Sequence, residues 1–288
     1  MNNFIISAFG DEIADDLRTQ MDVLSSHDIK YIEMRGVNGK ALVQHTLEEV
    51  YGIKQELDKR GFRISAIGSP IGKINITDDF QPHLSLFRHT VEIAKILEAQ
   101  FIRMFSFFIP NGADPAVYRD EVIHRWNEFI RTAEGAGLVL LHENEKEIYG
   151  DTPERCLELM ETLNCSFLKA VFDPANFVQC GVEPYPYAFD MLKGHIGYVH
   201  VKDALYSDHS VVPAGYGDGK LKEILTALMN NGYGGFLSLE PHLGVFTGFA
   251  ELEHNTRILA TPGDGPGKFA IAAGALKDII EGLSESHS

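Results

Sequence analysis

The chain has 288 residues, of which 44% are hydrophobic, so it is long enough to bury a large core. Its formal net charge of −16 disfavours binding to nucleic acids and to anionic membranes, because both carry negative charge. The three cysteines are widely spaced and form no CxxC pair, which predicts free thiols and a cytoplasmic location. The chain has neither a basic N-terminal signal region nor an apolar run of roughly 18 residues, which a membrane helix needs.

Short apolar segments rich in β-forming residues recur along the chain. The predicted strands are, in chain order, Phe4–Ala8, Lys30–Met34, Phe62–Ile67, Phe101–Phe105, Leu138–His142, Leu168–Asp173, Ile196–Val201 and Phe236–Glu240. Successive starts lie about 26 to 40 residues apart, a spacing that suits strand–helix units and not hairpins.

The segments between these strands carry apolar residues at helical spacing. The predicted helices are Ala14–Ser26, Thr46–Arg60, Leu84–Glu98, Ala116–Ala136, Glu154–Thr162, Lys220–Met229 and Lys268–Leu283. In the second of them, Leu47, Val50 and Leu57 lie on one stripe, and Gly61 follows its end. The last five residues, from Ser284 onwards, are expected to be frayed.

Eight strand–helix alternations without a break in composition predict a single (β/α)8 TIM barrel over residues 1–288. The rival architecture is an open, doubly wound sheet. A dinucleotide-binding sheet of that kind carries G-x-G-x-x-G after its first strand, whereas this chain reads AFGDEIAD there. The closed barrel is therefore favoured.

In such a barrel, functional residues lie where the strands end. The last four predicted strands each end at or near a residue that can ligate a metal ion, and these residues are Glu143, Asp173, His200 and Glu240. Alternation along the fifth strand puts Val139, Leu141 and Glu143 on one face. Three converging carboxylates repel one another and need a cation. Oxygen ligands with one imidazole suit Mn²⁺, Mg²⁺, Co²⁺ or Zn²⁺, so one divalent ion is expected.

The segments HEN, FDPANF, HVKDA and LSLEPH stand in this order on the last four predicted strands. Together they resemble the xylose-isomerase-like barrel superfamily of sugar and sugar-phosphate isomerases and epimerases, and the resemblance covers nearly the whole chain. It implies that the four residues named above are the metal ligands, with Mn²⁺ the ion most expected. It also implies that Glu143 and Glu240 act as acid and base.

Two positions near the expected ligands qualify the resemblance. Glu145 competes with Glu143, but the family pattern places the ligand directly before an asparagine, which favours Glu143 and leaves Glu145 in a solvated loop. Asn176 stands where many family epimerases carry a histidine. An asparagine can hydrogen-bond a hydroxyl but carries no proton at neutral pH, so Asn176 is expected to bind substrate.

Further substrate-binding candidates lie close to the strand ends. Lys202 shares a face with His200 and could contact a substrate oxygen, while Asp203 could orient either of them or form a structural salt bridge. Arg35, after the second strand, could clamp the substrate or pair with Glu33.

His242, after the last strand, is expected on the opposite face from Glu240 but within reach of the mouth, since strand ends twist. No Arg/Lys cluster is apparent at the predicted mouth, which favours a neutral sugar.

The resemblance implies a divalent-metal-dependent keto-sugar epimerase or isomerase that transfers a proton through an enediolate stabilised by the ion. The partner would be a small-molecule sugar, and a homodimer or homotetramer is compatible with such barrels. The first alternative is a metal-dependent lyase or dehydratase acting on an oxidised sugar or keto acid, which shares the proton-abstraction step. An endonuclease-IV-like hydrolase is less favoured because of the acidic charge and Asn176, and a metal-free binding protein because of the acid cluster.

Overall fold

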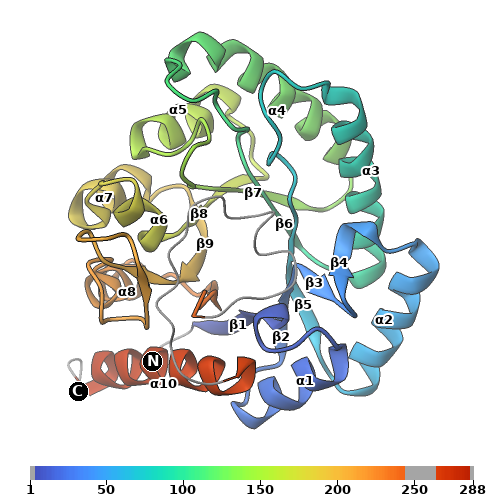
Figure 1. The fold of residues 1–288 in the computed structure, drawn as a ribbon, viewed down its shortest axis with the longest axis vertical. Helices are drawn as coiled ribbons and strands as arrows, with labels where there is room; N and C mark the ends of the chain where they lie inside the picture. The colour runs from blue at the N-terminus through green and yellow to red at the C-terminus, as the bar shows by residue number, and fades with distance from the viewer. Residues whose placement is uncertain (1–3, 244–263, 286–288) are drawn as a thin grey trace.

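The computed structural model describes residues 4–243 and 264–285. Eight parallel strands close into a barrel in the order β1-β12-β9-β8-β7-β6-β5-β2 (Figure 1). The strands are β1 (Ile5–Phe9), β2 (Tyr31–Met34), β5 (Arg63–Gly68), β6 (Phe101–Met104), β7 (Val139–Glu143), β8 (Leu168–Phe172), β9 (Ile196–Val201) and β12 (Phe236–Leu239). The predicted (β/α)8 barrel is confirmed, and every predicted strand end lies within one residue of the observed end.

Helices form a ring around the barrel (Figure 1). They are α1 (Leu17–Ser26), α2 (Leu47–Lys59), α3 (Phe80–Leu97), α4 (Arg119–Ala133), α5 (Pro153–Leu163), α6 (Pro174–Gln179), α7 (Phe189–Leu192), α8 (Leu221–Asn230) and α10 (Gly265–Glu285). The short helices α6 and α7 were not predicted, because neither is long enough to show an apolar period. None of the described helices is long and apolar enough to cross a membrane.

Capping explains where two of the helices begin. Helix α1 begins at Leu17 and not at Ala14, because the Asp16 side chain accepts a hydrogen bond from the Thr19 N–H. Helix α3 begins at Phe80, before the predicted start, because Asp79 caps it. At the other end of the chain, α10 extends to Glu285, so the expectation that the tail frays from residue 284 is wrong for its first two residues. Residues 286–288 lie outside the described part.

Two small hairpins lie beyond the carboxyl ends of barrel strands. Strands β3 (Gly36–Val37) and β4 (Lys40–Ala41) pair after β2, and β10 (Asp203–Ala204) pairs with β11 (Val211–Val212) after β9. A 3-10 helix, η1 (Gly10–Glu12), follows β1 in the same way. These segments add walls to the end of the barrel where the parallel strands finish.

Apolar side chains fill the barrel below this end. Leu141 of β7, Val171 of β8 and Tyr198 of β9 form one buried cluster with Ala66 of β5. Side chains alternate along a strand, so every second residue points inward. The next inward positions on or directly after these last three strands are Glu143, Asp173 and His200. The polar centre therefore rests on a packed floor and not on an open pore.

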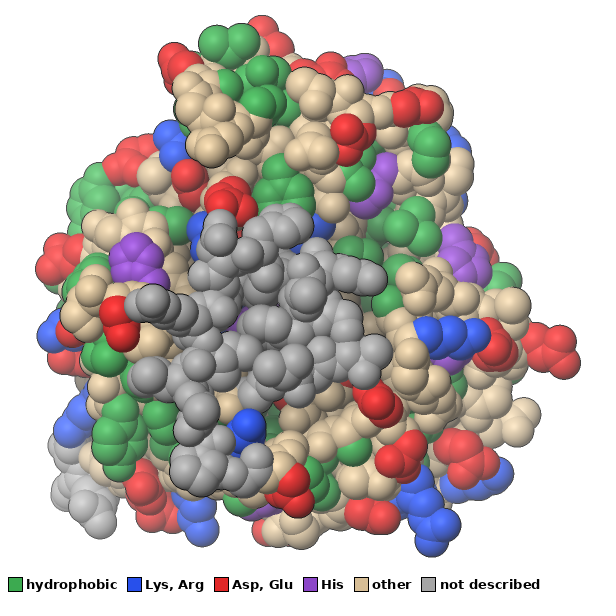
Figure 2. Space-filling model, viewed as in Figure 1, with side chains coloured by type: hydrophobic (Ala, Val, Ile, Leu, Met, Phe, Trp, Pro, Cys, Tyr) green, Lys and Arg blue, Asp and Glu red, His purple; other side chains and the backbone are tan. Residues whose placement is uncertain are grey.

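The outer surface agrees with the acidic composition. Figure 2 shows Asp and Glu side chains scattered around the periphery of the visible face, interspersed with fewer Lys and Arg side chains. A second, larger apolar core lies between the barrel and its helices and contains Trp126, which is fully buried.

Candidate metal centre at the barrel mouth

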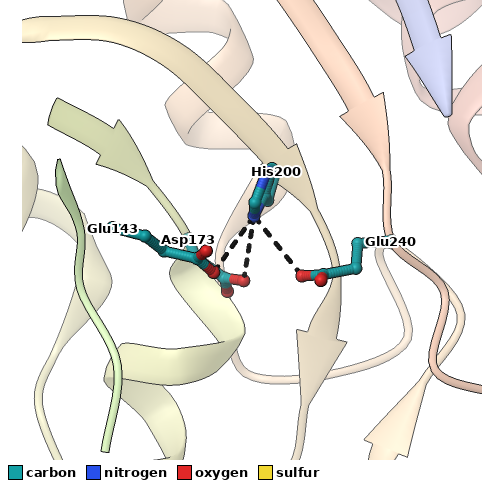
Figure 3. Close-up of side chains that lie close together, drawn as sticks. All are labelled: Glu143, Asp173, His200 and Glu240. Carbon is teal, nitrogen blue, oxygen red and sulfur yellow. Dashed lines mark hydrogen bonds and ion pairs between the residues drawn. The ribbon is translucent and has the colours of Figure 1, made fainter. Parts of the chain in front are cut away.

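The four expected ligands come together at the carboxyl ends of four neighbouring strands. Glu143 ends β7, Asp173 follows β8, His200 lies in β9 and Glu240 follows β12. All four are buried, with exposed fractions between 0 and 2%. Figure 3 shows the three carboxylates pointing toward the His200 ring from separate strands. The barrel closure thus brings together residues that are about 100 positions apart in the chain.

The imidazole Nδ1 of His200 lies at the centre of this group. It is 3.1 Å from Glu143 Oε1, 3.3 Å from Glu240 Oε2 and 3.8 Å from Asp173 Oδ2. One ligand atom of each residue lies within 4.8 Å of the others. Three carboxylates and one imidazole in so small a volume form a donor set that suits a divalent ion. The residues present therefore fit the metal ion that the sequence predicts.

Glu33 contacts the other side of the same imidazole. Its Oε1 and Oε2 lie 3.3 and 3.2 Å from His200 Nε2, and Glu33 is fully buried. A carboxylate in this position accepts a hydrogen bond from Nε2–H, so Nδ1 is the nitrogen that would give up its proton to ligate an ion. Burial opposes the charged form of His200, but Glu143, Glu33 and Glu240 raise its pKa well above the usual value.

Arg103 is a site residue that the sequence interpretation missed. Its Nη1 lies 3.2 Å from Glu143 Oε2, and its Nε lies 4.0 Å from Glu33 Oε1. A signal was present in the sequence. Arg103 interrupts the apolar strand FIRMF and shares one face of it with Phe101 and Phe105. A charged residue inside a buried strand needs a partner there.

Basic residues do gather at the mouth, so the expectation of no Arg/Lys cluster is wrong. They come from β6 and from the segments after β2, β5 and β9, which the sequence alone could not place together. The four buried cations are Arg35, Lys73, Arg103 and Lys202. The carboxylates that face them are Asp11, Glu12, Glu33, Glu143, Glu145, Asp173 and Glu240. The carboxylates outnumber these basic residues, so the mouth carries an excess of negative charge that a divalent cation can neutralise.

Arg35 connects Glu240 to the 3-10 helix η1, which follows β1. Its Nε and Nη2 bind Asp11 at 2.7 and 3.0 Å, Nη2 also binds Glu12 Oε1 at 3.2 Å, and Nη1 binds Glu240 Oε1 at 3.2 Å. Glu33, the partner considered from the sequence, faces His200 and Arg103. Arg35 thus lies at the predicted site and holds one oxygen of an expected ligand.

Lys202 also contacts expected ligands. Its Nζ lies 2.9 Å from Asp173 Oδ2 and 3.1 Å from Glu240 Oε2. Burial disfavours the charged form of Lys202, yet Asp173 and Glu240 raise its pKa well above the ordinary value. In the same way, Lys202, His242 and His200 overcome burial and hold the pKa of Glu240 well below its usual range. Glu240 is therefore a carboxylate at neutral pH.

Asn176 lies beside Glu143. Its Nδ2 donates to Glu143 Oε1 at 3.1 Å and to the Asn144 carbonyl at 2.9 Å. Its backbone N–H donates to Asp173 Oδ1 at 2.9 Å, because Asp173 caps helix α6. Its Oδ1 is buried and accepts no hydrogen bond from the described residues.

His242 reaches the mouth, and the expectation that it lies on the opposite face from Glu240 is wrong, because residues two positions apart share a face. Its Nε2 lies 3.4 Å from both Glu12 Oε1 and Glu240 Oε1, and its backbone N–H donates to Glu12 Oε2 at 2.7 Å.

Two other expectations, for Glu145 and Asp203, are corrected by the structure. Glu145 is buried and pairs with Lys73 at 3.3 Å, so it is not solvated.

The expectation that Asp203 could orient Lys202 or His200 is wrong. It accepts backbone N–H groups from Gly215, Gly217 and Gly219 at 2.9, 3.0 and 2.8 Å, and so anchors the loop after β11. Glycines are needed because a Cβ at Gly217 would lie 2.3 Å from the Asp203 carboxylate.

Comparisons with known proteins agree with this architecture. A family model described as the xylose isomerase-like TIM barrel matches residues 21–259. A D-tagatose 3-epimerase-like protein has a TM-score of 0.75 and 18% identity, with 99% of this chain and 100% of that chain covered. An L-ribulose 3-epimerase has a TM-score of 0.75 and 16% identity, with 100% and 97% covered. The probable 3-DHS dehydratase of Bacillus anthracis has a TM-score of 0.71 and 17% identity, with 97% and 99% covered.

No curated protein sequence matches the chain. At identities of 18% and below, the three structural similarities show the shared fold alone. The family match covers most of the chain, and the closed parallel barrel is the fold that this family has. The chain belongs to the family of xylose isomerase-like TIM barrels.

Proposed function

We propose that this protein is a divalent-metal-dependent epimerase or isomerase of keto-sugars. One observation carries the proposal: Glu143, Asp173, His200 and Glu240 present ligand atoms within 4.8 Å of one another at the barrel mouth. The epimerases among the structures with the same fold support a sugar as the substrate class. Mn²⁺ is the ion that we expect, with Mg²⁺, Co²⁺ and Zn²⁺ as substitutes.

When bound, a divalent ion supplies a Lewis acid that polarises a ketone oxygen and stabilises negative charge as the neighbouring proton leaves. Asp173 and His200 hold the ion in this scheme. Glu143 and Glu240 flank His200 from β7 and β12, so they approach a substrate at the mouth from two sides. One glutamate removes the proton next to the carbonyl and the other returns a proton from the opposite face.

The surrounding residues orient these glutamates and the substrate. Arg103 and Asn176 fix Glu143, while Arg35 and Lys202 fix the two oxygens of Glu240. In this proposal Lys202 donates to a substrate oxygen, and Asn176 Oδ1, which has no partner among the described residues, accepts from a substrate hydroxyl.

The test is deuterium incorporation from D₂O into free ketoses and 3-keto-sugars in the presence of Mn²⁺. Wild-type protein should incorporate deuterium at the carbon next to the carbonyl. Glu143→Gln and Glu240→Gln should lose at least about a hundredfold in rate, while Glu161→Gln, an exposed control on α5, should not. Metal content should be measured for each variant, so that a lost ion is separated from a lost proton carrier.

Near-normal incorporation by Glu240→Gln with bound metal would overturn the assigned roles. Product mass separates the main alternative, because an isomer keeps the mass of its substrate whereas a dehydratase product has lost water. A product lighter by one water would replace the epimerase with a dehydratase that uses the same glutamates.

A further inference from the structure

A cavity of about 620 Å³ adjoins the metal centre on its β2 and β5 side. Its walls come from the β3–β4 hairpin and from the loop after β5. The lining residues that matter here are Arg35, Val37, Ala41, Val43, Pro70 and Lys73. The cavity is separate from the ligand group, and the proposed proton transfer does not use it.

Arg35 joins this cavity to the reacting end of the site. Its side chain lines the cavity, and its Nη1 lies 3.2 Å from Glu240 Oε1. Lys73 lines the same cavity and binds Glu145 Oε2 at 3.3 Å, two residues beyond Glu143. Arg35 and Lys73 thus contact both the cavity and the residues around the ligand group.

The cations at the cavity are held in fixed positions and neutralised. The Arg35 guanidinium stacks 4.5 Å from the centre of the Phe9 ring, and Lys73 Nζ lies 4.5 Å from the centre of Phe105. Arg35 faces three carboxylates, and Lys73 faces Glu145. Lys40, at the outer edge, binds Glu49 at 2.7 Å. Because these positive charges are already matched, the cavity is not built for a phosphate group.

Of the other lining residues, Asp15 and Gln44 lie exposed at the outer edge, Asp11 is bound to Arg35, and the inner walls are mostly apolar. Val37, Ala41, Val43, Pro70 and Leu86 face the cavity. A volume of about 620 Å³ falls within the range of roughly 300–1,000 Å³ that suits a drug-sized ligand, and it exceeds what an additional hydroxyl or methyl group fills. Apolar walls with satisfied charges favour a neutral, apolar group over a second sugar.

We propose that the substrate is a glycoside and that its apolar aglycone, an aryl or alkyl group, occupies this cavity while the sugar ring lies at the metal centre. This inference rests on the proposed function for its sugar end. The cavity acts as the specificity subsite, and Arg35 marks the boundary between the two parts of the substrate.

The first test is binding, which needs no turnover. Isothermal titration of the Mn²⁺-loaded protein with phenyl β-D-glucoside, against glucose as the reference, measures the aglycone contribution. Phenyl glucoside should bind at least about tenfold more tightly than glucose. Ala41→Trp, which fills the cavity from a half-exposed position, should remove that difference. Gln44→Trp, from an exposed lining position, provides a second variant should the first be unstable.

Ala113→Trp is the matched control, because Ala113 is a half-exposed alanine that lines a different cavity. It should leave both affinities unchanged. Equal binding of glucose and phenyl glucoside by the wild type, or an undiminished preference in both Trp variants, would overturn the aglycone subsite. Tighter binding of cellobiose than of phenyl glucoside would replace the apolar group with a second sugar and also overturn it.

The second test compares deuterium incorporation into 3-ketoglucose and phenyl 3-ketoglucoside. The aryl glycoside should react at least about tenfold faster in kcat/KM, and Ala41→Trp should abolish this advantage while keeping exchange into 3-ketoglucose. Exchange into 3-ketoglucose alone refutes the subsite and leaves the epimerase intact. Exchange into neither compound, with the binding preference present, refutes the epimerase and leaves the subsite intact.

Discussion

The Nε2 atom of His200 lies 3.2 Å from Oε2 of Glu33, on the other side of the imidazole ring from the three carboxylates that face Nδ1. Glu33 comes from β2, 167 residues earlier in the chain, and is fully buried. The hydrogen bond keeps a proton on Nε2 and directs Nδ1 at the ligand group, so Nδ1 is the nitrogen that would lose its proton when an ion binds. The geometry of the candidate metal centre therefore depends on a residue that is not itself a ligand.

The first prediction concerns this pair. Glu33→Gln keeps the shape of the side chain but removes the negative charge behind His200, so Mn²⁺ affinity should fall by about 10- to 100-fold. Isothermal titration of chelator-treated protein measures it. Glu48→Gln, an exposed control on α2, should bind Mn²⁺ like the wild type. Wild-type affinity in Glu33→Gln would show that the contact does not orient the ligand.

Lys202 provides a prediction about metal removal. Lys202→Met removes the ammonium group that lies 2.9 Å from Asp173 and 3.1 Å from Glu240. In metal-free protein these carboxylates then repel, and the free energy of unfolding should fall by about 3 kcal/mol. With saturating Mn²⁺ the loss should be smaller, because the ion neutralises the same groups.

Urea denaturation with Mn²⁺ or with EDTA measures both values for Lys202→Met. Lys193→Met, which removes an exposed partner of Asp190, is the control and should change little in either condition. An equal loss with and without metal would contradict the idea that Lys202 and the ion share ligands.

Asp203 allows a prediction about the loop after β11. Asp203→Asn leaves one acceptor oxygen in place of two and turns an NH₂ group toward the backbone N–H groups of Gly215, Gly217 and Gly219. The free energy of unfolding should fall by about 2 kcal/mol. Chemical denaturation checks this against Asp190→Asn on the surface, and equal stability of the two variants would speak against the anchor.

His83 gives a prediction about pH. Its Nε2 accepts the Gly72 N–H at 2.7 Å, and burial, together with Arg125, lowers its pKa from 6.5 to about 4. The unfolded chain therefore binds a proton at higher pH than the folded chain does. The stability from neutral His83 is complete above about pH 6.5 and is lost as the pH falls toward 4, by up to about 3 kcal/mol.

His83→Gln keeps an acceptor for the Gly72 N–H without a titrating ring. Its unfolding free energy should decline less steeply than that of the wild type between pH 6.5 and pH 4. Urea denaturation at intervals across this range measures the slopes, and parallel slopes would exclude His83 as the titrating group.

The barrel and the convergence of the four expected ligands could be predicted because the information is local. Each of the last four strands ends near its own ligand, and the alternation of side chains fixes which face carries it. Strand ends were accurate for the same reason, since every strand is a short apolar run with clear borders.

The environment of the ligands could not be predicted, because it depends on contacts across the barrel. Glu33 and His200 meet only when the barrel closes, and Arg103 finds Glu143 on the neighbouring strand. A polar residue after a strand, such as Glu145, looks solvated in the sequence until Lys73 is brought beside it from another loop. The charge balance at the mouth is likewise a property of the closed fold.

The most direct test of the central claim is deuterium incorporation into a keto-sugar as Mn²⁺ is added back to chelator-treated protein. If the four residues hold one ion that supports proton transfer, the rate should rise in proportion to added metal and stop rising at one equivalent per chain. His200→Asn should show no such rise at these concentrations. Full exchange in the metal-free protein, or a rate that does not respond to the ion, would contradict the claim.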